Sequence, residues 1–207
     1  MKLKSILAAG LIPIFLFGYS LIILAQEIQP IKLLPPQTEG GKPLMQALKS
    51  RMTQRDFSPQ ELPLQVLSDL LWAANGINRP ESNHHTAPTA MNMQEIDIYV
   101  AKSDGLYLFD AQANILKPVL AADIRALTGM QPFVKTAPVS LIYVADFSRM
   151  RGKDADFYAA TDTGFISQNV YLYCASFGLA TVVRGSIDRA ALAKAMKPRP
   201  DQKIIFA

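Results

Sequence analysis

The distribution of charge sets residues 1–25 apart from the rest of the chain. Met1–Lys4 is a short basic start, and Ile6–Ala25 is apolar and carries no charged side chain. A basic start, an apolar stretch and a small residue at its end are typical of a secretory signal. The stretch is also long enough to span a bilayer, so an uncleaved membrane anchor is the alternative. In either case we expect the following domain to be extracytoplasmic, either periplasmic or secreted.

Residues 26–42 are rich in proline, glycine and glutamine, which predicts a linker or an extended arm before the folded domain. The domain itself is expected to span residues 43–207. Its first apolar positions, Leu44, Ala47 and Leu48, recur at helical spacing and predict a short helix that begins near Pro43.

A second helix is predicted to begin at residues 58–61, "SPQE". Serine can cap a helix, proline suits the first helical position, and glutamate completes a capping box. Leucines at helical spacing follow, and Asn75-Gly76 is a stop signal. The polar residues 77–94 then predict a long loop, and loops of that length in compact domains tend to be functional or disordered.

The second half of the chain alternates between strand and helix patterns. Strands are predicted at 95–101, at 105–110 and 114–119 as a hairpin, at 137–146 as a buried strand, and at 203–207. Helices are predicted at 122–129, 154–177 and 188–196, and residues 180–185 as a short strand or turn. Because helices and strands mix without strict βαβ alternation, the pattern favours the α+β class.

Charge and cysteine content exclude several classes of function. Without Lys2 and Lys4 the chain keeps 19 basic and 17 acidic side chains, and it has no dense basic run, which argues against nucleic-acid binding. Cys174 is the only cysteine, and its apolar surroundings predict a buried, inert thiol. The only histidines, His84 and His85, are adjacent and lack a second cluster of ligands, so we expect no metal site.

Three polar segments carry the candidate chemistry. Arg51 and Arg55 flank Thr53, and two guanidinium groups with a hydroxyl between them can hold a phosphate. Residues 88–94 offer a hydroxyl and two amides that suit the edge of a heterocycle, and residues 181–185 close on a glycine and expose backbone N–H groups. No motif with its own catalytic side chains is present, so an enzyme of this kind would rely on a cofactor.

In this order the segments resemble the nitroreductase superfamily of flavin proteins. The matching pieces are "LKSRMTQRDF", "LSDLLWAANGINRP", "TAPTAMNMQEIDIYV", "GLYLFD" and "DTGFISQNVYLYCASFGLATVVRG". The similarity covers about residues 43–207 and is greatest to the branch that contains azoline-oxidising dehydrogenases. It implies a central, mostly antiparallel sheet flanked by helices, an intertwined homodimer, and FMN at the dimer interface.

The resemblance also implies which residues contact FMN. The arginine-containing loop would hold the phosphate and ribityl chain, a second segment would contact the flavin of the partner subunit, and a third would place backbone donors near the reactive flavin edge. The long helix at 154–177, which carries small residues, would be the central dimer helix. The implied contacts are Arg51, Met52, Thr53 and Arg55; Pro88, Thr89, Ala90 and Asn92; and Val183, Arg184 and Gly185.

Three departures from the family pattern shape the functional hypothesis. Met52 stands where arginine or histidine is common, Ala207 ends the sequence where relatives continue, and the export signal makes NAD(P)H a doubtful electron donor. The leading hypothesis is an exported FMN-dependent oxidoreductase that transfers hydride through flavin N5 to or from a small substrate. The alternative is a degenerate, non-redox member that binds another ligand or only dimerises. No side chain is assigned a catalytic role.

Overall fold

A six-stranded sheet in the order β1-β6-β5-β4-β7-β8 forms the centre of the computed structural model, which describes residues 27–207. Every pairing in it is antiparallel, which confirms the predicted α+β class and antiparallel sheet. The predicted signal or anchor at 1–25 lies outside the described residues. Within 27–207, no helix is both long and apolar enough to cross a membrane. The strands are β1 (Ile31–Lys32), β4 (Ile96–Ala101), β5 (Leu106–Asp110), β6 (Ile115–Leu120), β7 (Ser140–Asp146) and β8 (Gln202–Phe206).

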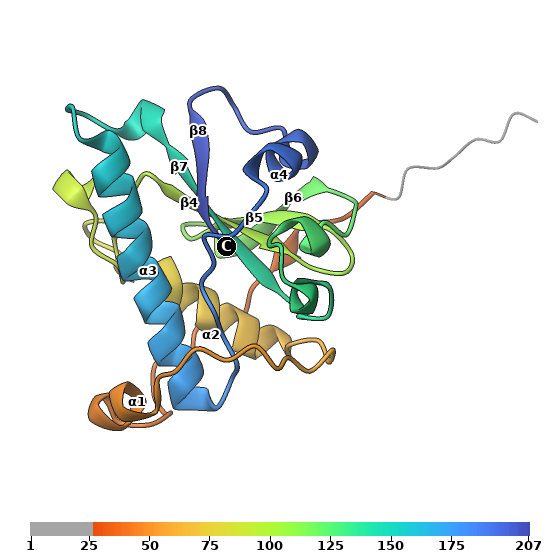
Figure 1. Cartoon of the computed structure of the whole chain (residues 1–207). Helices are drawn as coiled ribbons and strands as arrows, with labels where there is room; N and C mark the ends of the chain where they lie inside the picture. The colour runs from red at the N-terminus through yellow and green to blue at the C-terminus, as the bar shows by residue number, and fades with distance from the viewer. Residues whose placement is uncertain (1–26) are drawn as a thin grey trace, which may run out of the picture.

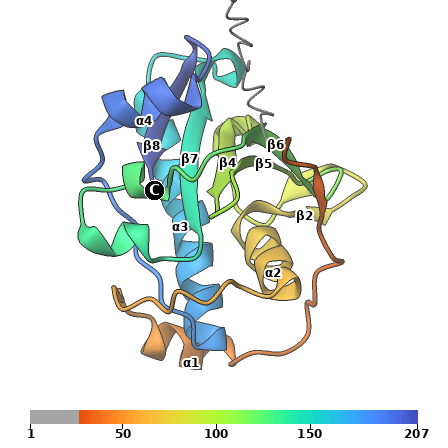
Figure 2. The same cartoon turned by 90° about the vertical axis from the view of Figure 1, so that its right-hand side faces the viewer.

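Helices cover both faces of the sheet (Figures 1 and 2). Two of them, α2 (Leu64–Asn75) and α3 (Ala155–Phe177), lie on one face, and α4 (Arg189–Met196) lies on the other. The short helix α1 (Leu44–Ser50) packs against α3. The described residues form two apolar cores, one on each face of the sheet. Alternate residues of β4 pack into one core or the other, because successive side chains of a strand point to opposite faces. This is the physical origin of the alternation seen in the sequence.

Most of the predicted elements are confirmed. The strands at 95–101 and 137–146, the hairpin, the final strand and the helix at 188–196 all form within two or three residues of their predicted bounds. The long helix forms as α3 and ends at Gly178, whose φ of 72° is the left-handed conformation that favours glycine at a helix end.

The predicted helix start at 58–61 is wrong, because α2 begins only at Leu64. Pro63 explains the difference: proline lacks an N–H group and disfavours helical geometry in the residue before it. It therefore takes the position just before the helix. The Ser58 hydroxyl accepts a hydrogen bond from the Gln60 N–H at 3.2 Å, so the supposed cap stabilises a turn instead.

Three further segments differ from or refine their predictions. The polar residues 77–94 are ordered by a small hairpin of β2 (Ile77–Arg79) and β3 (His84–His85), followed by the 3-10 turn η1 (Ala90–Asn92). The predicted helix at 122–129 is only the 3-10 turn η2 (Arg125–Leu127), and 180–185 forms no regular element. From residue 27 onward the segment before the domain is an extended arm, because β1 pairs with β6 and Leu33 is buried.

Candidate functional site

The C-terminal half of α3 brings two of the three predicted segments together. The buried Tyr171 places its hydroxyl 3.0 Å from Thr53 Oγ1, and the same hydroxyl accepts the Val183 N–H at 3.1 Å. The Gln54 N–H donates to the Thr181 carbonyl at 3.0 Å, which adds a direct link between the two loops. The loops at 51–55 and 181–185 therefore form one surface built around a tyrosine that sequence reasoning did not identify.

Both arginines of the first loop remain available for an anion. The Arg51 guanidinium lies over the Tyr171 ring, 5.3 Å from its centroid, at the end of α1. Arg55 and Met52 are exposed. Within residues 27–207, neither arginine forms an ion pair with a carboxylate. Two unpaired guanidinium groups next to a hydroxyl are suited to bind phosphate oxygens.

The third predicted segment, Pro88 to Asn92, is held rigidly but lies apart from the other two segments. The Ala90 N–H donates to Oδ2 of the buried Asp162 on α3 at 2.8 Å, and Thr89 Oγ1 accepts the Gln94 N–H at 3.0 Å. Met91, Asn92 and Gln94 have φ values near +50°, a conformation that is costly for residues other than glycine. Such strain persists only where the surrounding contacts fix it, and it is frequent at binding sites.

A single chain does not bring this segment to the other two. Asp162 and Tyr171 are nine residues apart on α3, which corresponds to roughly 13 Å along a helix axis. The first two segments dock at the C-terminal half of α3, and the third docks nearer its N-terminus. Within one chain, the third segment therefore lies at a different level of α3 from the other two.

A cavity of about 330 Å³ lies beside the first two segments. Its walls come from residues 56–62, residues 133–141, the C-terminal half of α3 and residues 178–184. Cys174 lines it, but burial raises the pKa of this thiol to about 12, so the thiol is inert at neutral pH. The Arg184 side chain also faces the cavity and is 8% exposed.

The two histidines lie in β3, away from this cavity, and burial lowers the pKa of His85. In the part of the chain from 27 to 207, no three His, Cys, Asp or Glu side chains gather in a way that could hold a metal. The histidines therefore have no assigned role in the site.

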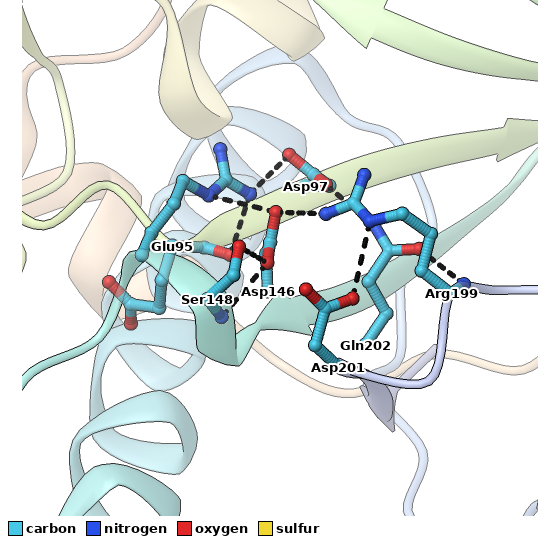
Figure 3. A network of polar contacts seen from close by, with 8 residues as sticks. Glu95, Asp97, Asp146, Ser148, Arg199, Asp201 and Gln202 are labelled. Atoms are coloured by element: carbon cyan, nitrogen blue, oxygen red, sulfur yellow. Dashed lines mark hydrogen bonds and ion pairs between the residues drawn. The ribbon is translucent and has the colours of Figure 1, made fainter.

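Figure 3 shows an ion-pair cluster where β4, β7 and β8 meet. Asp146 pairs with Arg149 Nε at 3.3 Å and with Arg199 Nη2 at 2.5 Å, and Asp97 pairs with Arg149 Nη2 at 2.6 Å. Burial opposes the charged form of Asp146, but hydrogen bonds from Ser148 and Arg199 keep its pKa below the ordinary value. The cluster ties the end of the chain to the sheet.

Glu95 turns its carboxyl group away from this cluster (Figure 3). The side chain is 0% exposed, and within the described residues neither carboxyl oxygen has a hydrogen-bond partner. Burial, together with the nearby carboxylate of Asp162, raises the pKa of Glu95 to about 7. Two carboxyl groups thus face each other beneath the strained Pro88–Asn92 segment.

The sequence profile described as the nitroreductase family matches residues 48–207, which is most of the chain. The chain belongs to the nitroreductase family. A nitroreductase homologue from Ralstonia eutropha is 42% identical, and its crystal structure superposes with a TM-score of 0.81 over 86% of each chain. A nitroreductase homologue from Methanocaldococcus jannaschii is 30% identical over 156 residues, which cover 69% of this chain and 78% of the relative.

More distant structures share the nitroreductase fold. One, from Desulfovibrio desulfuricans, was solved in complex with FMN; it is 20% identical, covers 80% of this chain and 83% of its own, and has a TM-score of 0.59. The Escherichia coli microcin synthetase complex McbBCD contains a chain that is 16% identical, with a TM-score of 0.64 over 95% of this chain and 82% of that one. At such identities the likeness shows the fold alone.

The residues present fit a flavin mononucleotide. Arg51 and Arg55 supply unpaired cations for a phosphate, as described above. Among residues 27–207, the backbone N–H groups of Val182 and Gly185 find no acceptor, so they can donate to the carbonyl and nitrogen atoms of a heterocycle. Pro88 to Asn92 of a second copy would complete the set.

Proposed function

We propose that this nitroreductase-family protein is an FMN-dependent oxidoreductase that acts as a homodimer. The observation that carries the proposal is the joining of the 51–55 and 181–185 loops through Tyr171, with two unpaired arginines on the resulting surface. Family membership supports the same assignment. When bound, FMN supplies hydride transfer through its N5 atom.

The residues of this chain would bind and orient the cofactor and substrate. Arg51 and Arg55 would neutralise the phosphate, and the Thr53 hydroxyl would bind beside it. The backbone N–H groups of Val182 and Gly185 would stabilise negative charge on the flavin edge, whereas those of Val183 and Arg184 already donate to the Tyr171 hydroxyl and the Ala207 carbonyl. No side chain acts as an acid or base in this scheme.

A second copy is proposed to dock on the outer face of α3. Phe157 and Phe165 on α3 are 67% and 44% exposed, and Leu44 and Met45 on α1 are 62% and 75% exposed. Exposed apolar side chains that gather on a surface are typical of a protein interface. A Cβ atom at Gly164 would meet nothing within 4 Å, so a second backbone can approach α3 closely at that point.

We also propose that the protein acts outside the cytoplasm on a small-molecule substrate, with an electron donor other than NAD(P)H. The basic and apolar residues 1–25 support this location. Cell fractionation followed by N-terminal sequencing tests it. Recovery of the chain with an intact N-terminus in the cytoplasmic fraction would contradict it.

Titration of FMN against the protein tests the flavin assignment, with quenching of flavin fluorescence as the signal. Arg51→Ala removes a charged donor, and hydrogen bonds to charged groups contribute roughly 1.5–3 kcal/mol, so the Kd should rise at least tenfold. Lys49→Ala, also basic and at the end of α1, is the matched control and should bind like the wild type.

A failure to bind FMN would support the alternative, a non-redox member of the family. A ligand at about 100 times its Kd stabilises a protein by roughly 2.7 kcal/mol. A folded protein whose thermal unfolding is unchanged by excess FMN would therefore be a family member without flavin chemistry.

A further inference from the structure

The strained Pro88–Asn92 segment is tied to α3 through a single carboxylate. Asp162 on α3 is 2% exposed, and its Oδ2 atom accepts the Ala90 N–H at 2.8 Å. In residues 27–207 no other hydrogen bond joins the segment to this helix. Because the φ values of Met91 and Asn92 lie near +50°, the segment keeps this conformation only while its contacts hold it.

Glu95 lies three residues after Asn92, immediately before β4, and its side chain is fully buried. Neither carboxyl oxygen has a hydrogen-bond partner within the described residues. The backbone carbonyl of Glu95, by contrast, accepts the Asp146 N–H and Arg149 Nη2, both at 2.9 Å. The donors around Glu95 are therefore used by its backbone, and an ionised side chain would be a buried charge without a donor, which is costly.

The two buried carboxyl groups of Glu95 and Asp162 differ in which of them suits the charged form. Asp162 accepts an N–H group, which favours its ionised state. Glu95 has no such donor, and its pKa is raised to about 7 by burial, by the charge of Asp162 and by a hydrogen bond with that side chain. Two interacting carboxyl groups do not both ionise readily, so the pair holds one proton, and the O–H of Glu95 donates to Asp162.

The other charged groups near Glu95 do not replace this proton. Arg149 lowers the pKa of Glu95, but its guanidinium group pairs with Asp97 and Asp146, and the carboxyl group of Glu95 turns away from that cluster (Figure 3). His85, in the neighbouring hairpin, has a pKa lowered by burial and is neutral at neutral pH. Among residues 27–207, Asp162 is therefore the acceptor for the proton of Glu95.

We propose that Glu95 is a positioning residue: it shares one proton with Asp162, and this proton keeps the Pro88–Asn92 segment in its strained conformation. When the proton passes to solvent, both carboxyl groups are charged and repel each other, and the segment relaxes. The segment is thus held below neutral pH and released above it. The consequence for the cofactor rests on the function proposed above, in which this segment of one copy contacts the FMN of the other.

A nitroxide label at position 91 of the full chain, observed by electron paramagnetic resonance, tests the proposal. Met91 is 71% exposed, and Met91→Cys provides one reactive thiol because burial raises the pKa of Cys174 to about 12. With the pKa of Glu95 at about 7, roughly nine-tenths of the chains keep the proton at pH 6 and about one-tenth at pH 8. The label should therefore be restricted at pH 6 and mostly mobile at pH 8.

Three controls separate this effect from a general loosening of the chain. Glu95→Gln replaces the O–H by an amide N–H that cannot be lost, so the label at position 91 should stay restricted at both pH values. Asp156→Asn removes an exposed carboxylate of α3 that pairs with Lys203, and it should respond like the wild type. A label introduced by Met130→Cys, where the native side chain is 73% exposed, should not respond to pH.

Three results would overturn the proposal. In the wild-type background, a label at position 91 that is equally restricted at pH 6 and pH 8 would do so without any variant of Glu95. A Glu95→Gln chain that responds normally would show that another group titrates. Equal loosening at position 130 would show that the whole chain responds.

Fluorescence titration with FMN tests the link to the flavin site. The Kd of the wild type divided by that of Glu95→Gln should be close to one at pH 6 and about tenfold higher at pH 8, because the binding-competent fraction falls to roughly a tenth. The ratio removes the effect of pH on FMN itself. An unchanged ratio would overturn the coupling to the flavin site. Failure of both proteins to bind FMN would refute only the function proposed above, because the label experiment needs no flavin.

Discussion

The hydroxyl of Tyr171 joins the two loops of the candidate site, and its removal should be measurable. Tyr171→Phe leaves the Val183 N–H and Thr53 hydroxyl without their partner. We expect a loss of about 1–3 kcal/mol in the free energy of unfolding, together with weaker FMN binding. Denaturant unfolding measures the first effect. Tyr173→Phe, whose hydroxyl makes only a 3.4 Å bond to the Val66 carbonyl, should change stability by less than about 0.5 kcal/mol.

Glu95 should make stability depend on pH. Its pKa is raised from 4.5 to about 7 in the folded protein, so the folded state binds the proton more tightly than the unfolded chain. Stability should therefore fall as pH rises from 4.5 to 7, by up to about 3 kcal/mol. The facing charges are Asp162, which raises the pKa, and Arg149, which lowers it.

Urea unfolding across this pH range, compared between wild type and Glu95→Gln, isolates the effect. Glutamine keeps the shape of the neutral acid but cannot titrate. The free energy of unfolding of the variant should therefore not show this decrease with rising pH. Equal slopes in the two proteins would show that Glu95 is not the titrating group.

At the level of single residues, the sequence located the charged and turn-forming members of the site but not the residues that join them. Arg51, Thr53 and Val183 stand in recognisable local motifs. Tyr171 contacts Thr53 across 118 positions, and the burial of Glu95 beside Asp162 depends on distant segments. Local spacing carries no information about either property.

The long helix α3 organises the molecule at the level of elements. Its inner face packs on the sheet and α2, while its outer face carries Phe157, Phe165 and the open Gly164. The small residues of α3 and the glycine that ends it could be predicted from the sequence. The start of α2 was predicted too early, because Pro63 prevents the helix from beginning at the capping signal five residues before it.

A charge on the outer face of α3 should prevent dimer formation. Phe165→Glu introduces a carboxylate into the proposed interface, and desolvating it costs several kcal/mol. The variant should elute as a folded single chain in size-exclusion chromatography with light scattering. Val119→Glu on β6, where the wild-type side chain is 42% exposed, is the control and should remain a dimer. A dimeric Phe165→Glu protein would place the interface elsewhere.

At the scale of the whole molecule, the proposed flavin site is shared between two copies of the chain. The strained Pro88–Asn92 segment lies roughly 13 Å along α3 from the two joined loops, and in the proposed homodimer the segment of one copy would complete the site of the other. The strand positions followed from the alternating patterns, because alternation specifies which face of each strand is buried. The antiparallel sheet was implied by the family resemblance, and the strand order came only from the structure. The homodimer was implied only by the resemblance and stays a prediction, because association depends on the shape of a surface that strand patterns do not describe.

Sedimentation velocity of the purified protein with added FMN, recorded at the visible flavin absorbance, tests the central claim most directly. Flavin absorbance should sediment with a species of twice the chain mass, at one FMN per chain. Flavin that remains unbound, or that sediments with a single chain, would contradict a cofactor site shared between two copies.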